Sequence, residues 1–237
     1  MSAAREQVSI APGLYAEVSG TGSPVLLVHG FGDDLHTWDG LITDLESRHT
    51  VVRFDLPGHG RSINFGSTPA DHERDVALEL VDTMVTFCQS RSGRRQVNIV
   101  GHSLGGYLAM CHAVRRPETT NALGLIATGP GFRRTESRAK WNSMAAKATA
   151  AFGLAEYVAP LCQQHDALVL DGLDRLAMPV AQVVGSEDSH YFAGMEVLDS
   201  RLPDISTVRV DGGRHHVHQT HPAEVLAALA IVRDRRP

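Results

Sequence analysis

The sequence predicts an α/β fold in which one mostly parallel, twisted sheet carries helices on both faces and a small helical segment is inserted near its middle. Two observations predict this class. Short apolar runs rich in β-branched residues alternate with longer segments of helical periodicity, as in parallel strands joined by crossover helices. The chain has 237 residues, of which 43% are hydrophobic and 21% charged, which suits one globular domain.

The strands are predicted where short runs rich in apolar, β-branched residues occur. Six such runs are typical of buried strands: 25–28, 51–54, 97–100, 123–127, 180–184 and 207–210. Two earlier runs, 8–10 and 15–19, are separated by Ala-Pro-Gly and predict an antiparallel hairpin at the sheet edge.

Helices are predicted where apolar residues recur every three or four positions, over 70–89, 105–116 and 222–233. The last of them begins with Pro222, which is favoured in a first helical turn. These segments separate the predicted strands, so we expect crossover helices and a doubly wound sheet.

The segment 129–177 interrupts the alternation, because it contains helical patterns over 136–151 and 154–161 but no strand pattern. We therefore expect a core formed by residues 1–128 and 178–237 and a short helical lid formed by 129–177. The apolar face of this lid is predicted to comprise Trp141, Met144, Phe152, Tyr157 and Leu161.

Charge and composition restrict the partners and the compartment. The formal net charge of −5 gives no broad basic field, so we expect no nucleic-acid partner. No apolar run approaches the ~18 residues of a membrane span and the first residues are polar, which predicts a cytoplasmic protein. Cys88, Cys111 and Cys162 are widely spaced and are expected to be reduced, buried thiols. No sequence pattern indicates an oligomeric state.

The strongest motif is Gly101-His102-Ser103-Leu104-Gly105, which lies between a predicted strand and a predicted helix. A G-x-S-x-G in this context presents its serine on a sharp turn, and the glycines leave room for the reversal of the chain. We predict Ser103 as a nucleophile. Cys111 is a weaker rival, because no turn motif presents it.

A serine hydroxyl needs a histidine base, and the base needs an acid that fixes its tautomer. Asp188 follows the predicted strand 180–184 and is the expected acid, with Glu187 as its rival. Four histidines compete for the role of base. His215 is preferred because it comes soonest after the last strand, and the alternatives are His216, His218 and His221.

Acyl chemistry also needs donors for an oxyanion. The backbone N–H of Leu104 follows the nucleophile, and that of Phe31 lies in the glycine-flanked turn after the strand 25–28. The histidine cluster at 215–218 could in principle bind a metal ion, but this would sequester the base. We expect no cofactor and no metal, and we expect His29, His59 and His102 to orient loops of the site.

Four segments in order resemble the α/β-hydrolase superfamily over nearly the full chain: His29-Gly-Phe-Gly32, Asp55-Leu-Pro-Gly-His-Gly-Arg-Ser62, the turn around Ser103, and the loops of acid and histidine. The resemblance implies the roles given above for Ser103, Asp188, His215, Phe31 and Leu104. In two respects the chain departs from the family pattern: Arg214 stands where glycine commonly precedes the base, and the lid is short, which suggests an open pocket.

The resemblance implies a serine hydrolase that cleaves a carboxylic ester or lactone of a small organic substrate through an acyl-enzyme. A serine at the turn excludes the dehalogenase and epoxide hydrolase branches, which use aspartate there. Two alternatives stay open: a carbon–carbon bond hydrolase or lyase on the same triad, and a non-catalytic ligand-binding protein.

Overall fold

The centre of the molecule is one eight-stranded sheet with the strand order β1-β2-β4-β3-β5-β6-β7-β8. The computed structural model describes residues 5–233. β1 pairs antiparallel with β2, and β2 with β4, whereas all later pairs are parallel. The strands are β1 (Glu6–Ser9), β2 (Tyr15–Ser19), β3 (Ser23–Val28), β4 (His49–Phe54), β5 (Val97–His102), β6 (Thr120–Ile126), β7 (Val180–Gly185) and β8 (Ile205–Val210).

All six predicted buried strands and the edge hairpin are therefore present. The main error lies at the strand predicted over 123–127, which begins at Thr120 and ends at Ile126. It ends there because Ala127 has φ 47°, in the left-handed region that a strand does not use.

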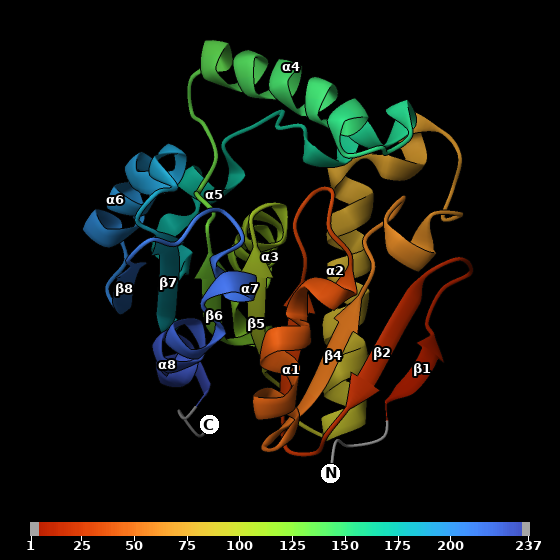
Figure 1. Cartoon of the computed structure of the whole chain (residues 1–237), viewed down its shortest axis with the longest axis vertical. Helices are drawn as coiled ribbons and strands as arrows, with labels where there is room; N and C mark the ends of the chain where they lie inside the picture. Colours follow the sequence, from red (N-terminus) through yellow and green to blue (C-terminus); the bar gives the residue numbers. More distant parts are fainter. Residues whose placement is uncertain (1–4, 234–237) are drawn as a thin grey trace.

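Helices cover both faces of the sheet, with α1 and α8 on one face and α2 and α3 on the other (Figure 1). The short helices α1 and α6 follow strands and carry too few apolar repeats to be predicted from the sequence. The helices are α1 (Asp39–Glu46), α2 (Arg74–Ser92), α3 (Leu104–Arg115), α4 (Thr135–Ala151), α5 (Leu168–Asp171), α6 (Phe192–Arg201), α7 (Val217–Thr220) and α8 (Pro222–Arg233).

The core consists of two apolar clusters, one on each face of the sheet. Successive residues of β3 belong to different clusters: Leu26 packs with α2 and α3, and Leu27 packs with α1 and α8. Both side chains are fully buried. Because successive strand residues point to opposite faces, a strand covered on both faces is apolar throughout, which is why these runs were predicted as buried.

The segment between β6 and β7 contains no strand, and Figure 1 shows its longest helix, α4, lying above the sheet. Its second helix is a 3₁₀ helix over Glu156–Cys162 with Pro160 inside it, not the regular helix expected over 154–161. Arg74 at the start of α2 holds this segment through two hydrogen bonds of 2.8 Å to the carboxylate of Asp166.

The apolar face predicted for this segment is only partly buried. Leu161 is fully buried, but Met144 and Phe152 are 54% and 52% exposed. Phe152 lies against the ring of Phe31, with 6.2 Å between ring centroids, and covers Gly32. The prediction of an inward-facing Met144 is wrong, because the helix periodicity alone does not tell which side of α4 meets the body.

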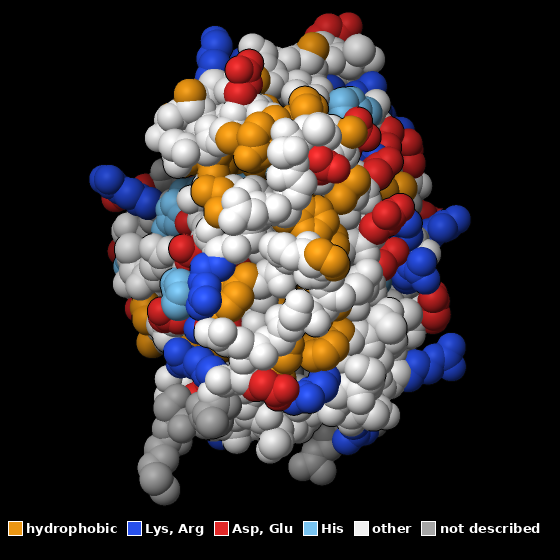
Figure 2. Space-filling view, turned by 90° about the vertical axis from the view of Figure 1, so that its right-hand side faces the viewer, with side chains coloured by type: hydrophobic (Ala, Val, Ile, Leu, Met, Phe, Trp, Pro, Cys, Tyr) orange, Lys and Arg blue, Asp and Glu red, His pale blue; other side chains and the backbone are white. Residues whose placement is uncertain are grey.

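Figure 2 shows one face of the molecule, on which hydrophobic side chains form several groups and Lys and Arg are spread among Asp and Glu. All three cysteines are free and buried, as predicted. Within residues 5–233, no helix combines the length and apolar character needed to cross a bilayer. The parts of the predicted core at 1–4 and 234–237 lie outside the described residues.

Candidate active site

Ser103 lies on a strained turn between β5 and α3. Its backbone has φ 51° and ψ −116°, a conformation that costs a non-glycine residue free energy. The turn is fixed by the Ser103 N–H, which donates to the Ile126 carbonyl at 2.9 Å, and by the Thr128 hydroxyl, which donates to the Ser103 carbonyl at 2.7 Å. The side chain of Ser103 is partly exposed at the carboxyl end of β5.

The glycines of the motif are required by close backbone approaches. A Cβ atom at Gly105 would lie 2.0 Å from the carbonyl oxygen of Val28, and one at Gly101 would lie 2.4 Å from the backbone of Gly105. The turn therefore packs directly on the end of β3, where the loop of Phe31 begins.

The structure brings Asp188 and His215 together. His215 Nδ1 and Asp188 Oδ2 are 2.9 Å apart, and Asp188 is only 7% exposed. Glu187, its rival, instead accepts from Arg214 Nε at 2.8 Å on the surface. A buried carboxylate at this atom can hold the Nδ1–H tautomer of His215, which leaves Nε2 free to accept a proton.

The structure also explains why arginine is tolerated at position 214, where the family commonly has glycine. A Cβ atom at Gly185 would lie 2.1 Å from the backbone of Gly213, so the loops of Asp188 and His215 approach each other through two glycines. The glycine that the close approach requires is therefore Gly213, one position before Arg214. The Arg214 side chain extends outward and is 83% exposed.

Tyr191 is a site residue that the sequence did not reveal. Its hydroxyl lies 3.4 Å from Ser103 Oγ, and its ring stacks on His215 with 5.0 Å between centroids and 14° between planes. Among the described residues, Ser103 Oγ has no hydrogen bond to His215. Burial raises the pKa of Tyr191 to about 12, so its hydroxyl stays protonated at neutral pH. The only signal in the sequence was its place three residues after Asp188.

Two buried histidines hold the loop of Phe31. His59 Nε2 accepts from the Gly32 N–H at 3.0 Å, and His29 Nε2 accepts from the Leu56 N–H at 2.8 Å. Burial lowers the pKa of His29 to about 3 and that of His59 to about 4, so both are neutral and can accept. Leu104 is the first residue of α3, where backbone N–H groups lack partners within the helix.

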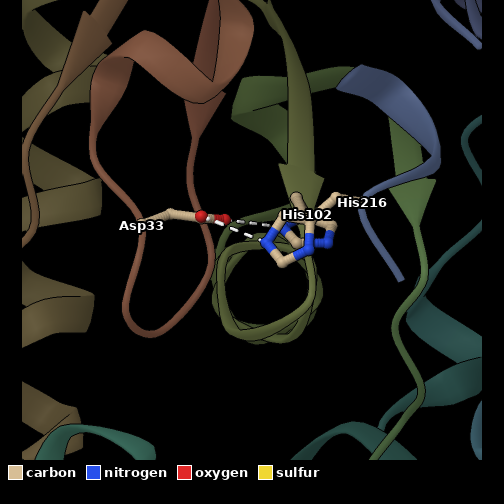
Figure 3. A group of neighbouring side chains, drawn as sticks. All are labelled: Asp33, His102 and His216. Carbon is tan, nitrogen blue, oxygen red and sulfur yellow. Dashed lines mark hydrogen bonds and ion pairs between the residues drawn. The ribbon is translucent and has the colours of Figure 1, made fainter. Parts of the chain in front are cut away.

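The histidines after β8 do not form one ligand cluster, because each has a different partner. His215 contacts Asp188, His216 Nε2 contacts Asp33 Oδ1 at 3.1 Å, and His218 Nε2 contacts the Thr37 hydroxyl at 2.7 Å. A different group of three could offer metal ligands: within residues 5–233, Asp33, His102 and His216 have ligand atoms within 4.8 Å of one another (Figure 3).

Cys111, the rival nucleophile, is fully buried inside α3. Burial raises the pKa of its thiol to about 12, so the reactive thiolate is absent at neutral pH. Its position and charge state both argue against nucleophilic chemistry there.

Comparison with known proteins identifies the family of the chain. The model of the alpha/beta hydrolase family matches residues 25–229. A pimeloyl-[acyl-carrier protein] methyl ester esterase of Aeromonas hydrophila is 27% identical over 89% of this chain and 95% of its own length. Its counterpart in Nitrosomonas europaea is 34% identical over 54% of this chain, a match that spans only 45% of that protein.

A solved structure has the same fold. The crystal structure of a bromoperoxidase from Bacillus anthracis superposes with a TM-score of 0.78, covering 98% of this chain and 100% of that one. The two sequences are only 15% identical, so this likeness concerns the fold alone.

Proposed function

The chain belongs to the alpha/beta hydrolase family, and on this premise we propose that it is a serine esterase acting on a carboxylic ester or lactone of a small organic substrate. The observation that carries the proposal is the 2.9 Å contact of His215 with the buried Asp188, beside a serine on a strained turn. The two esterases named above support ester hydrolysis rather than another reaction.

In the proposed mechanism, His215 Nε2 removes the proton of Ser103 Oγ as the oxygen attacks the ester carbonyl. The tetrahedral oxyanion accepts hydrogen bonds from the backbone N–H groups of Leu104 and Phe31. The imidazolium then gives its proton to the leaving alcohol, and the acyl group stays on Ser103. Asp188 remains ionised throughout and stabilises the imidazolium.

A water molecule completes the cycle. His215 removes a proton from the water, which attacks the acyl carbonyl, and the same proton returns to Ser103 Oγ as the carboxylic acid leaves. Ser103 Oγ lies 3.4 Å from the Tyr191 hydroxyl, and in the proposed mechanism its hydrogen bond to His215 forms when substrate binds. Catalytic hydrogen bonds are often long or misaligned before that step.

We propose further that 129–177 acts as a lid over this site and that the remainder forms the hydrolase core. Phe152 supports this, because it extends from the end of α4 to cover Gly32 and Phe31 in the loop assigned to the oxyanion. A small-molecule substrate would lie between this segment and Ser103.

The proposal is tested with a fluorophosphonate probe, which reacts covalently with activated serines. The folded wild-type protein should be labelled stoichiometrically, and peptide mapping should place the label on Ser103. With p-nitrophenyl butyrate, rapid mixing should show a burst of one p-nitrophenol per active site wherever deacylation limits turnover. A folded protein that is neither labelled nor active on a panel of esters and lactones would contradict the proposal, and it would favour a binding protein.

Replacing Tyr191 by phenylalanine tests what the hydroxyl near Ser103 contributes. The phenyl ring keeps the stacking on His215, so only the contact with Ser103 Oγ is lost. Because a typical hydrogen bond contributes about 1 kcal/mol, we expect kcat/KM of Tyr191→Phe to fall by roughly fivefold. Tyr191→Ala removes the ring as well and should cost more. Equal activity of the alanine and phenylalanine variants would show that the stacking does not orient His215.

A further inference from the structure

One carboxylate connects the two loops of the site. Asp33 lies in the loop after β3, and its two oxygens face different imidazoles: Oδ2 is 3.1 Å from His102 Nδ1, and Oδ1 is 3.1 Å from His216 Nε2. Figure 3 shows the carboxylate pointing at both rings, which come from β5 and from the loop before α7. His102 directly precedes Ser103, and His216 directly follows His215.

The connection continues from His102 to the backbone of the base. His102 Nε2 lies 3.0 Å from the carbonyl oxygen of His215. Burial lowers the pKa of His102, so its ring is neutral and carries a hydrogen on only one nitrogen. That hydrogen is donated either from Nδ1 to the Asp33 carboxylate or from Nε2 to the carbonyl of His215. His102 therefore bridges a carboxylate on one side and the backbone of His215 on the other.

We propose that Asp33 is a positioning residue of the active site, whose carboxylate holds the loop of His215 against the turn of Ser103 through His102 and His216. The inference rests on the proposed function. Asp33 lies two residues after Phe31, which is assigned to the oxyanion hole, and it acts through the two histidines rather than on the substrate.

The half of this connection between Asp33 and His102 is shielded from water. The side chain of His102 is 1% exposed and that of Asp33 is 14% exposed, whereas that of His216 is 42% exposed. Burial disfavours the ionised form of Asp33, but the hydrogen bonds from His102 and His216 outweigh it and hold the pKa of Asp33 below its ordinary value. The hydrogen bond to Asp33 in turn raises the pKa of His216. Hydrogen bonds to a charged, buried group are about twice as strong as neutral ones.

The same three residues could instead bind a divalent cation, since two imidazoles and a carboxylate are common ligands. The observed contacts favour the hydrogen-bonded arrangement, because each carboxylate oxygen is directed at its own ring nitrogen. A cation would have to replace both of these contacts at once. Zinc binding is therefore an outcome that the test includes.

The experiment compares Asp33→Ala and Asp33→Asn with Asp34→Asn. The control makes the same change of charge one residue later, at a helix N-cap where asparagine is equally good. With kcat counted per fluorophosphonate-reactive site, Asp33→Ala should lower kcat by about 10–100-fold and change KM by less than about threefold. Asp33→Asn, which keeps the shape but makes one atom a donor, should lower kcat less, and Asp34→Asn should match wild type.

A double variant tests whether Asp33 acts through His216. If Asp33 acts through His216, the double variant Asp33→Ala/His216→Ala should be little worse than Asp33→Ala alone. Titration of the His216 ring by NMR should give a pKa above 6.5 in the wild type and a lower one in Asp33→Asn. Unchanged kcat in both Asp33 variants, or fully additive losses in the double variant, would overturn the proposal.

Two further outcomes are separated by the same measurements. Zinc binding to the wild type that disappears in Asp33→Ala, followed by calorimetry, would replace the positioning role by a cation site. Absence of Ser103 labelling in the wild type would contradict the proposed function. The NMR titration needs no activity, so it would still decide whether Asp33 holds His216. Should Asp33→Ala fail to fold, the asparagine variant supplies both the kinetic and the NMR result.

Discussion

Ser103→Ala is expected to lower kcat/KM for ester hydrolysis by about 10⁴–10⁶-fold, the range found when a triad nucleophile is removed. The loss is large because the nearest hydroxyls are poor substitutes: burial raises the pKa of Tyr191 to about 12, and the Thr128 hydroxyl donates to the Ser103 carbonyl. Cys111 is buried in α3 with a raised pKa. The remaining rate would come from the oxyanion donors and from binding alone.

The measurement is steady-state hydrolysis of p-nitrophenyl esters together with fluorophosphonate labelling. Ser90→Ala is a matched control, since Ser90 is an exposed residue of α2 whose hydroxyl only donates to a carbonyl of its own helix. The variant at Ser103 should fold like the wild type, because removing its hydroxyl leaves the bonds of its backbone in place. Activity within about tenfold of wild type would mean that another group is the nucleophile.

The sheet could be predicted because its signal is local. A strand such as β5 contains a run of apolar residues at 97–100, and the motif around Ser103 follows that run directly, so one short stretch predicts both the strand and the nucleophile. The sequence also located Asp188 at the end of β7 and His215 after β8, because chain segments that follow parallel strands gather at one edge of the sheet.

Tyr191 and Asp33 could not be predicted in the same way. Each acts through residues about 70 to 180 positions away, and neither belongs to a motif. Which side chain reaches Ser103 depends on the direction taken by the first turn of the helix Ser189–Tyr191. Which carboxylate reaches His216 depends on two loops meeting, and only the folded chain specifies that.

The choice between His215 and His216 is decided by replacing each with alanine. His215→Ala should lower kcat/KM by about 10⁴–10⁶-fold, because the imidazole that contacts Asp188 is lost and Ser103 has no base. His216→Ala should cost about 10–100-fold, because His216 faces Asp33 and contributes to the position of the loop. The two neighbours differ in the carboxylate that each one contacts, which is why their effects should differ so much.

Labelling separates loss of the base from loss of the fold. In His215→Ala the rate of reaction with fluorophosphonate should fall along with kcat, because that rate also depends on proton removal from Ser103. In His216→Ala labelling should stay within about 100-fold of wild type. The reverse order, with His216→Ala the more damaging variant, would assign the base to His216, whose Nδ1 is the ring nitrogen that does not face Asp33.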